Sequence, residues 1–401
     1  MTEFGAEIWE RLTKELAESS PTDLLVKLLA AIIFVALSYI AQKAFRWLIY
    51  QMRNNAIPGW GCCRRLATAQ KAVAEDGSGL WLSVRPRRMS HLDRLNNTNK
   101  LILTIANLKG GVGKTTITAN LAAFFANPFA ERNRPQRRVL VIDLDFQGSC
   151  SSMLFANTAW QPSGALLSDA SQAISGQFAG VRGQLGQAVV DIPSARGISA
   201  FYDLARVENR EMIRWLIGDE VEDIRFRLAN LLTSDTVFNQ FDVVLIDAPP
   251  RLTTGSVQAF CASTHVLIPT ILDPLGGEDP VGYFGQQLKA HAELWPHLKV
   301  LGVIGTMTDR RARAQEEPAL KRAGDRLRFA LQGAPISLKH VETRGTTLEF
   351  PYECTLRRSS PLARAAGEGI PYVALGNTQA GRAIRAMFDQ IGEEVVRRWQ
   401  L

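Results

Sequence analysis

The chain has 401 residues, a length that fits two or three structural units at about 150 residues each. Hydrophobic residues make up 46% of the sequence and charged residues 21%, which excludes a disordered chain and a membrane protein with many spans. The formal net charge of +7 permits contact with anionic lipid or nucleic acid without requiring either. Five cysteines without a CxxC pair or a zinc spacing argue against a disulfide scaffold and a structural metal site.

An apolar segment near the start of the chain predicts a membrane-spanning helix. Residues 24–41, from Leu24 to Ala41, read LLVKLLAAIIFVALSYIA and as a helix would extend about 27 Å, nearly the thickness of the hydrocarbon layer. Lys27 is their only charge and lies one turn from the start, where its side chain reaches the headgroups. We expect a transmembrane helix with an interfacial extension over residues 24–50, and a buried core helix is the alternative. The cations and aromatic residues typical of a membrane surface follow the apolar run: Lys43, Arg46, Trp47 and Tyr50.

The charges on either side of this segment predict its orientation. Residues 1–23 form a short acidic tail without the basic start of a cleaved signal peptide. Cations follow the segment, so the positive-inside rule places everything after residue 50 in the cytoplasm. The expected topology is a single pass with the N-terminus outside.

Residues 51–98 predict a basic linker. Pro58 and Gly59, the turn at residues 76–79 and the basic run at residues 85–88 interrupt any regular pattern. One short strand is expected, at residues 80–84. The basic residues fit binding to anionic headgroups and a solvated loop equally well.

A glycine loop between a strand and a helix predicts a phosphate-binding site. The apolar run at residues 101–107 (LILTIAN) precedes KGGVGKTT, and the helical sequence ITANLAAFF follows it. Glycines let backbone N–H groups converge on phosphate oxygens at the positive end of a helix. We expect Lys114 to reach the β- and γ-phosphates and the Thr115 hydroxyl to bind Mg²⁺. The expected nucleotide-binding residues are Lys109, Gly110, Gly111, Val112, Gly113, Lys114, Thr115 and Thr116.

The loop resembles the deviant Walker A motif of the ParA/MinD family of P-loop ATPases. The general pattern GxxxxGK[ST] would need glycine at position 108, where this chain has Leu108, whereas KGGxGKT matches the deviant form. The resemblance implies ATP and Mg²⁺ as ligands. It also implies that Lys109 is the family's signature lysine, which crosses an ATP-sandwich homodimer to the partner's phosphates.

Two further strand ends extend the resemblance. Residues 139–148 (VLVIDLDFQG) look like the family's switch region, in which Asp145 would orient the attacking water and Asp143 would lie near the metal. The family's usual proline after the second aspartate is Phe146 here. Residues 241–250 (FDVVLIDAPP) resemble the Walker B segment, in which Asp247 would bind Mg²⁺ through water. Relatives often carry serine after the double proline, where this chain has Arg251.

The C-terminal half continues the resemblance. Residues 189–194 (VVDIPS) and 264–269 (THVLIP) match family segments in the family's order. In the family, the segments matching residues 300–309 and 350–373 border the adenine. Met307, Asp309 and Pro351 are therefore the candidates for adenine contacts.

Strands alternate with helical stretches from residue 99 to residue 401, which predicts an α/β domain with a mainly parallel sheet wrapped by helices. The glycine loop and both aspartate-bearing loops follow strands. Since open α/β sheets bind ligands at the carboxyl ends of their strands, we expect these loops to meet at one site.

The resemblance implies a membrane-anchored ParA/MinD-type ATPase at the bacterial inner membrane, with its ATPase domain in the cytoplasm. ATP would draw two copies into a dimer, and Mg²⁺-assisted hydrolysis would release them. One alternative is a bacterial tyrosine autokinase, although the sequence has no tyrosine after Tyr372. Another is a nucleotide-dependent scaffold or sensor with little turnover.

The expected partners are a second copy of the chain, the membrane and an unidentified protein that stimulates hydrolysis. Non-specific DNA is a further expectation, because arginines gather near the C-terminus. Solvated helix faces are the more common explanation of such arginines. They are Arg357, Arg358, Arg364, Arg382, Arg385, Arg397 and Arg398.

Overall fold

The computed structural model describes residues 20, 22, 26, 29, 33, 36–37, 39–45, 60–76, 79–86, 91–129, 134–156, 167–177, 186–189, 191–219, 222–273, 278–336 and 347–400. It divides into two units, Met1–Ala67 and Thr68–Leu401. In the first unit, the described positions from 22 to 45 are helical. Among the described residues, no helix combines the length and the apolar character needed to cross a bilayer. Most of residues 24–41 lie outside the described residues.

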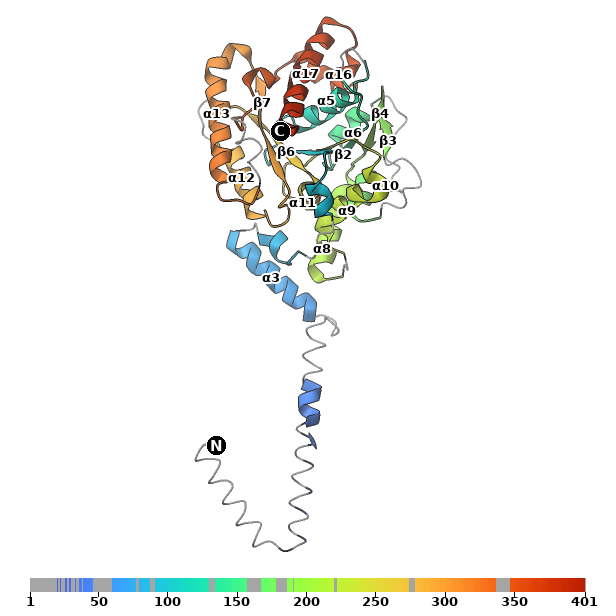
Figure 1. The fold of residues 1–401 in the computed structure, drawn as a ribbon, viewed down its shortest axis with the longest axis vertical. Helices are drawn as coiled ribbons and strands as arrows, with labels where there is room; N and C mark the ends of the chain where they lie inside the picture. The colour runs from blue at the N-terminus through green and yellow to red at the C-terminus, as the bar shows by residue number, and fades with distance from the viewer. Residues whose placement is uncertain are drawn as a thin grey trace. The chain divides into compact units, whose positions relative to one another are not determined.

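The second unit is built around an eight-stranded sheet with the order β3-β4-β2-β5-β1-β6-β7-β8 (Figure 1). Among the described strands, β3 and β4 pair in antiparallel fashion, and the other neighbours run parallel. The prediction of a mainly parallel sheet is therefore confirmed. The strands are β1 Leu101–Ile105, β2 Val139–Asp143, β3 Gln187–Val189, β4 Ile192–Ile198, β5 Val243–Asp247, β6 His265–Ile271, β7 Lys299–Thr308 and β8 Leu356–Arg357.

Helices cover both faces of the sheet, because the central strands are apolar on both sides. In β2, Val139 and Val141 pack into one buried cluster, and Leu140 and Ile142 into another. Such two-sided burial is typical of parallel strands. On one face lie α5 Lys114–Ala126, α6 Ser149–Leu154, α16 Pro371–Ala374 and α17 Gln379–Trp399. On the other lie α7 Asp169–Ile174, α8 Asp203–Ile217, α9 Arg227–Thr233, α11 Thr254–Ala262, α12 Pro280–Ala290 and α13 Arg313–Ala330 (Figure 1).

The C-terminal helix α17 packs closely on α5. Its apolar residues recur at the spacing of one helix face, and Ile384, Phe388 and Ile391 are buried in the cluster that contains α5. A Cβ atom at Gly392 would lie 2.5 Å from the ring of Phe124, so this close approach requires glycine. The remaining helical elements are α3 Trp60–Asp76, α4 Leu92–Asn96, α10 Asp235–Phe238, α15 Ser360–Ala365, η1 Gly79–Leu82, η2 Ile224–Phe226, η3 Arg310–Ala312 and η4 Tyr352–Cys354.

The segment before β1 corrects two sequence predictions. The strand expected at residues 80–84 is wrong, because residues 79–82 form the 3₁₀ helix η1. The linker expected as far as residue 98 is also too long, since Trp81 and Leu95 are buried in the clusters beneath the sheet. We call residues 79–86 and 91–96 the docked segment. The glycines and the basic run of this segment are typical of a loop. Its buried apolar residues are isolated in the sequence, so they form no periodic pattern that would indicate burial.

Contacts with Trp215 and Arg225 hold the first part of the docked segment, residues 79–86. The Trp81 ring stacks on that of Trp215 at 5.8 Å between centroids. The fully buried Arg225 guanidinium donates to the carbonyl oxygens of Trp81 at 2.5 Å and Val84 at 2.9 Å, and it pairs with Asp223. A ring of this size and a satisfied buried cation fix the segment against α8 and η2.

Candidate functional site

Strand register brings the three predicted loops to one edge of the sheet. Asp247 at the end of β5 is aligned with Ile105 of β1 on one side and with Asp143 of β2 on the other. We call the loops after these strands, residues 106–113, 144–148 and 248–253, the carboxyl edge. The expectation that these loops meet is confirmed.

The glycine loop has the backbone that an anion site needs. Gly111 has φ +70° and Gly113, the N-cap residue of α5, has φ +82°. Residues other than glycine rarely adopt these backbone angles. No heavy atom lies within 4 Å of the positions that Cβ atoms would take at Gly110 and Gly111, so the loop is open on that side. A Cβ atom at Gly113 would instead lie 3.0 Å from Leu356 of β8. The loop is therefore open toward solvent and closely packed underneath, at the positive end of a 13-residue helix.

The Lys114 side chain reaches from the start of α5 back to the first residue of the glycine loop. Its Nζ atom donates to the carbonyl oxygen of Lys109 at 3.1 Å. Burial lowers its pKa, and the nearby carboxylates of Asp247 and Asp145 act in the opposite direction. A buried lysine that donates to a carbonyl group of its own loop is suited to bind an anion that enters this loop.

Asp247 and Thr115 form the part of the site that fits a divalent cation. The Thr115 hydroxyl donates to Asp247 Oδ2 at 2.7 Å. Asp247 Oδ1 is buried and has no hydrogen-bond partner among the described residues. Burial first and then the neighbouring Asp143 raise the Asp247 pKa well above its usual range. Hard oxygen ligands with an unsatisfied buried acceptor suit Mg²⁺ and its water shell, which would favour the ionised carboxylate.

Asp143 has a different environment from Asp247. Its Oδ2 accepts from the Ser151 backbone N–H at 2.8 Å and from the Ser151 hydroxyl at 2.7 Å, and Oδ1 accepts from the Asp145 N–H at 3.0 Å. Burial raises its pKa to about 7, although these hydrogen bonds oppose the shift. The Asp143 carboxylate therefore fixes the turn at Asp145 and the first turn of α6. A position near the metal stays a prediction for Asp143.

Asp145 lies on a turn that the backbone fixes. Its Oδ1 accepts from the Gln147 N–H at 3.1 Å, and its carbonyl oxygen accepts from the Gly148 N–H at 2.8 Å. Gly148 has φ +65°, and a Cβ atom there would lie 2.8 Å from the Ala200 carbonyl oxygen. The half-buried Asp145 carboxylate is thus presented at the carboxyl edge beside Lys114.

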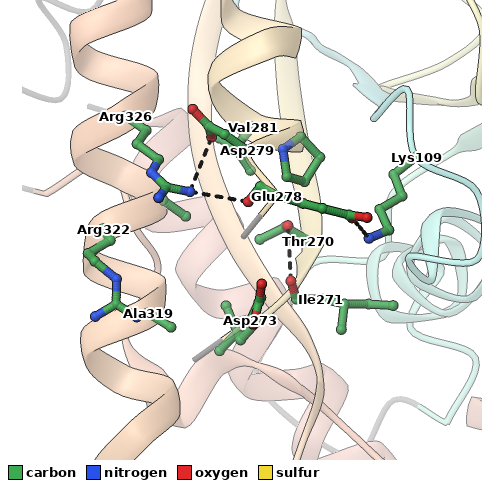
Figure 2. A pocket seen from close by; sticks show the side chains of 13 residues that line it. Lys109, Thr270, Ile271, Asp273, Glu278, Asp279, Val281, Ala319, Arg322 and Arg326 are labelled. Atoms are coloured by element: carbon green, nitrogen blue, oxygen red, sulfur yellow. Dashed lines mark hydrogen bonds and ion pairs between the residues drawn. The ribbon is translucent and has the colours of Figure 1, made fainter. Parts of the chain in front are cut away.

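Lys109 lies at the margin of a neighbouring cavity of about 340 Å³ (Figure 2). It forms an ion pair with Glu278, and the two side chains are 42% and 70% exposed. Arg326 of α13 donates to the Glu278 carbonyl oxygen at 3.2 Å and so ties this segment to the helix beside it. Exposed ion pairs contribute at most about 1 kcal/mol, so Lys109 can exchange Glu278 for another anion.

The candidate adenine residues lie at the end of β7 and at the start of η4. Met307 is exposed near the end of β7 and has φ +56°. The Tyr352 hydroxyl, directly after Pro351, donates to the Asp309 carbonyl oxygen at 2.9 Å. The ideal Cβ position of Gly113 lies 3.8 Å from Thr306, so this end of β7 borders the loop. Asp309 is thus tied to the residue that follows Pro351, and contact of Met307, Asp309 and Pro351 with adenine stays a prediction.

Sequence reasoning missed Glu208, which supports the carboxyl edge from below. Glu208 Oε1 accepts from the Thr253 hydroxyl at 2.6 Å and from the Gly255 N–H at 2.7 Å. Burial raises its pKa. A glutamate inside an ordinary amphipathic helix gives no signal of this role, because its partners lie about 45 residues further along the chain.

Two of the C-terminal arginines are unsuited to DNA. Arg398 is buried, pairs with Glu394 at 2.6 Å and donates to the Glu349 carbonyl oxygen at 2.7 Å. Arg385 is buried and donates to the Gly376 carbonyl oxygen at 2.6 Å. Both lie on the core face of α17, so the expectation that they belong to a DNA surface is corrected. The exposed members of the set are Arg358, Arg364, Arg382 and Arg397.

Comparison with known proteins agrees with this geometry. A family model described as an AAA domain matches residues 100–279. The chromosome partitioning protein ParA of Caulobacter vibrioides is 30% identical over 219 residues, which cover 54% of this chain and 73% of that protein. The chain belongs to the ParA/Soj family of P-loop ATPases.

Two further relatives extend over more of the chain. The chromosome-partitioning ATPase Soj of Thermus thermophilus is 29% identical over 252 residues, covering 61% of this chain and 86% of that protein. A structure of Cyanothece McdA in complex with ATP superimposes with a TM-score of 0.53 at 17% identity, covering 76% of this chain and 98% of the other. The latter likeness supports the fold. The family resemblance found in the sequence is confirmed.

Proposed function

We propose that this ParA-family chain is a membrane-anchored ATPase that cycles between a monomer and an ATP-sandwich dimer. The observation that carries the proposal is the Thr115–Asp247 pair beside the open glycine loop, with one Asp247 oxygen buried and unsatisfied. This arrangement fits a nucleotide triphosphate with Mg²⁺. ATP bound to the structurally similar McdA protein supports the choice of nucleotide.

The carboxyl edge would act mainly by electrostatic stabilisation. Backbone N–H groups at the start of α5 and the Lys114 ammonium would meet the negative charge of the phosphates. Thr115 and Asp247 would hold Mg²⁺, which neutralises charge on the transferring phosphoryl group when it is bound. Asp145 would orient the attacking water, and its fixed turn keeps the carboxylate in one position.

Dimer formation would depend on Lys109. In the monomer this cation lies at the surface and pairs with Glu278. In the dimer it would leave that pair for the phosphates bound by the partner, as the family resemblance implies. A single cycle of ATP binding and hydrolysis would then switch between two assembly states.

Membrane attachment through residues 24–41 is supported by side-chain exposure in the first unit. The described helical residues there expose large apolar side chains to solvent, which lipid would cover. The ATPase domain would then face the cytoplasm at the bacterial inner membrane. The exposed residues are Val26, Leu29, Ile33, Leu37, Tyr39, Ile40 and Phe45.

The proposal includes two further binding partners, DNA and a protein. Non-specific DNA is supported by the net charge of +7 and by the four exposed C-terminal arginines. An unidentified partner protein would stimulate hydrolysis. Washing membranes with carbonate tests the anchor, because a spanning helix resists extraction and a peripheral protein does not.

The structure weakens the tyrosine autokinase alternative. Tyr372, the last tyrosine of the sequence, is buried, and its hydroxyl donates a hydrogen bond to Asp389 Oδ1 at 2.7 Å. A buried hydroxyl is a poor phosphate acceptor. A scaffold or sensor that binds ATP with little turnover is distinguished from the ATPase by its rate of phosphate release.

Calorimetry with ATP and Mg²⁺ tests the proposal. Lys114→Ala should abolish ATP binding, since the variant loses the cation that spans the loop. Lys321→Ala, an exposed lysine on α13, is the matched control and should bind ATP as the wild type does. Equal ATP affinity in Lys114→Ala and wild type would contradict the proposal.

A further inference from the structure

Two departures from the family pattern meet at the carboxyl edge. Phe146 stands where relatives usually have proline, and Arg251 where they often have serine. The Arg251 guanidinium carbon lies 5.8 Å from the centroid of the Phe146 ring, within cation–π range. The Tyr202 ring lies on Phe146 as well, with centroids 6.3 Å apart and planes inclined by 55°.

Sheet topology explains why these three residues meet. They follow β2, β4 and β5, and β2 lies between the other two in the sheet. The loop carrying Phe146 is therefore flanked on one side by Tyr202 and on the other by Arg251. Phe146 also packs against the buried cluster beneath the loop, which leaves its ring in contact on several sides.

The backbone that carries Arg251 is itself held in place. The Arg251 carbonyl oxygen accepts from the Ser256 hydroxyl at 2.5 Å and from the Thr253 N–H at 3.1 Å. Thr253 is bound in turn by the buried Glu208. Tyr202 directly precedes α8. Both flanking residues thus come from anchored parts of the domain.

We infer that Arg251 and Tyr202 hold the Phe146 ring and through it position Asp145, so that Arg251 is a positioning residue in ATP hydrolysis. A proline at position 146 would restrict the backbone at 145 and 146 directly. In this chain the same restriction comes from side-chain contacts. The inference rests on the proposed function, in which the Asp145 carboxylate orients water.

A double-mutant cycle on the full-length chain tests the inference. Single-turnover hydrolysis and ATP affinity are measured for wild type, Arg251→Ser, Phe146→Leu and the double variant. Each single variant should lower the hydrolysis rate about fivefold, with ATP affinity within about twofold of wild type, because the contact acts on orientation. The double variant should be no slower than the slower single variant, since both remove one interaction.

Further variants separate positioning from direct contact and from misfolding. Arg251→Lys should recover part of the rate, because an ammonium also binds an aromatic face. Tyr202→Ala should slow hydrolysis about twofold to fivefold. Because the Tyr202 side chain is 72% exposed, its removal should leave the fold intact, so misfolding would not account for a slower rate. Arg94→Ser is the matched control: Arg94 lies 5.0 Å over Phe238, on another element, and its loss should leave the rate unchanged.

Two results overturn the inference while the proposed function stands. One is a wild-type rate in Arg251→Ser. The other is a double variant slowed by the product of the single effects, which means that Arg251 acts on the phosphates independently of Phe146. Failure of the wild type to hydrolyse bound ATP would contradict the proposed function, and the inference with it.

Discussion

The carboxyl edge and the docked segment are built in opposite ways. At the carboxyl edge, short runs of neighbouring residues supply glycines, a lysine, a threonine and carboxylates, and the backbone fixes their geometry. In the docked segment, single side chains from distant parts of the sequence hold one another, as Arg225 holds Trp81 and Val84. The first arrangement leaves the buried Asp247 Oδ1 without a hydrogen-bond partner, whereas in the second the Arg225 guanidinium is satisfied by carbonyl oxygens and by Asp223. This difference separates a site that binds a ligand from a contact that stabilises the fold.

Replacing Arg225 should give the largest effect and should be confined to stability. Arg225→Ala leaves Asp223 without its buried cation and removes two bonds to the docked segment, so the free energy of unfolding should fall by about 3–5 kcal/mol. Urea denaturation measures the change. Arg214→Ala, which removes an exposed ion pair with Asp219, should change stability by less than about 1 kcal/mol. Equal losses in the two variants would mean that the docked segment contributes little.

Asp145→Ala should show the reverse pattern, a loss of chemistry with little loss of stability. The half-exposed carboxylate is needed to orient water more than to bind ATP. Hydrolysis should slow by about 100-fold, while calorimetry should show retained ATP binding. Asp325→Ala, an exposed aspartate on α13, serves as the control. Wild-type phosphate release in Asp145→Ala would contradict the switch assignment.

Asp143, which holds the turn at the carboxyl edge, and His297, whose ring faces His91 of the docked segment, should respond to pH in opposite directions. Burial, and then His91, lower the pKa of His297 to about 4, while burial raises that of Asp143 to about 7. The His297 contribution to stability is present above its unfolded pKa of about 6.5 and is lost as pH falls toward 4. Asp143 disfavours folding when ionised, so its effect on stability becomes more favourable as pH falls from 7 toward 4.

Denaturation of the metal-free protein at several pH values separates these effects. His297→Phe should flatten the loss of stability between about pH 6.5 and 4, by up to about 1.4 kcal/mol per pH unit. The catalytic carboxylates are unchanged in this variant, so the difference from wild type belongs to His297. The same slope in both proteins would show that His297 does not titrate in this range.

Glu278→Gln should give the smallest effect. The variant frees Lys109 from an exposed ion pair, so ATP-dependent dimerisation should strengthen by no more than about fivefold. Lys109→Ala should instead weaken dimerisation and hydrolysis together. Sedimentation with ATP in the slow Asp145→Ala background measures dimerisation of each variant, with Glu293→Gln as the control. Phosphate release from Lys109→Ala alone measures its hydrolysis. Weaker dimerisation in Glu278→Gln would mean that Glu278 supports the dimer rather than competing with it.

Sequence predicts the carboxyl edge well because its chemistry is local. The strand, glycine loop and helix occupy consecutive residues, and alternating strands and helices bring Asp143 and Asp247 to the same edge. The docked segment could not be predicted this way, since Trp81 and Arg225 are 144 residues apart and a lone arginine in a sequence resembles a solvated charge. Arg398 misleads for the same reason: its role depends on carbonyl groups that only the fold brings to it.

Phosphate release from ATP by the full-length protein is the most direct test of the central claim. The account predicts steady turnover in the presence of Mg²⁺, loss of turnover when a chelator removes the metal, and no turnover in Lys114→Ala, since Thr115, Asp247 and Lys114 would act on one bound nucleotide. Phosphate release that persists in Lys114→Ala, or that is absent from wild type saturated with ATP and Mg²⁺, would contradict it.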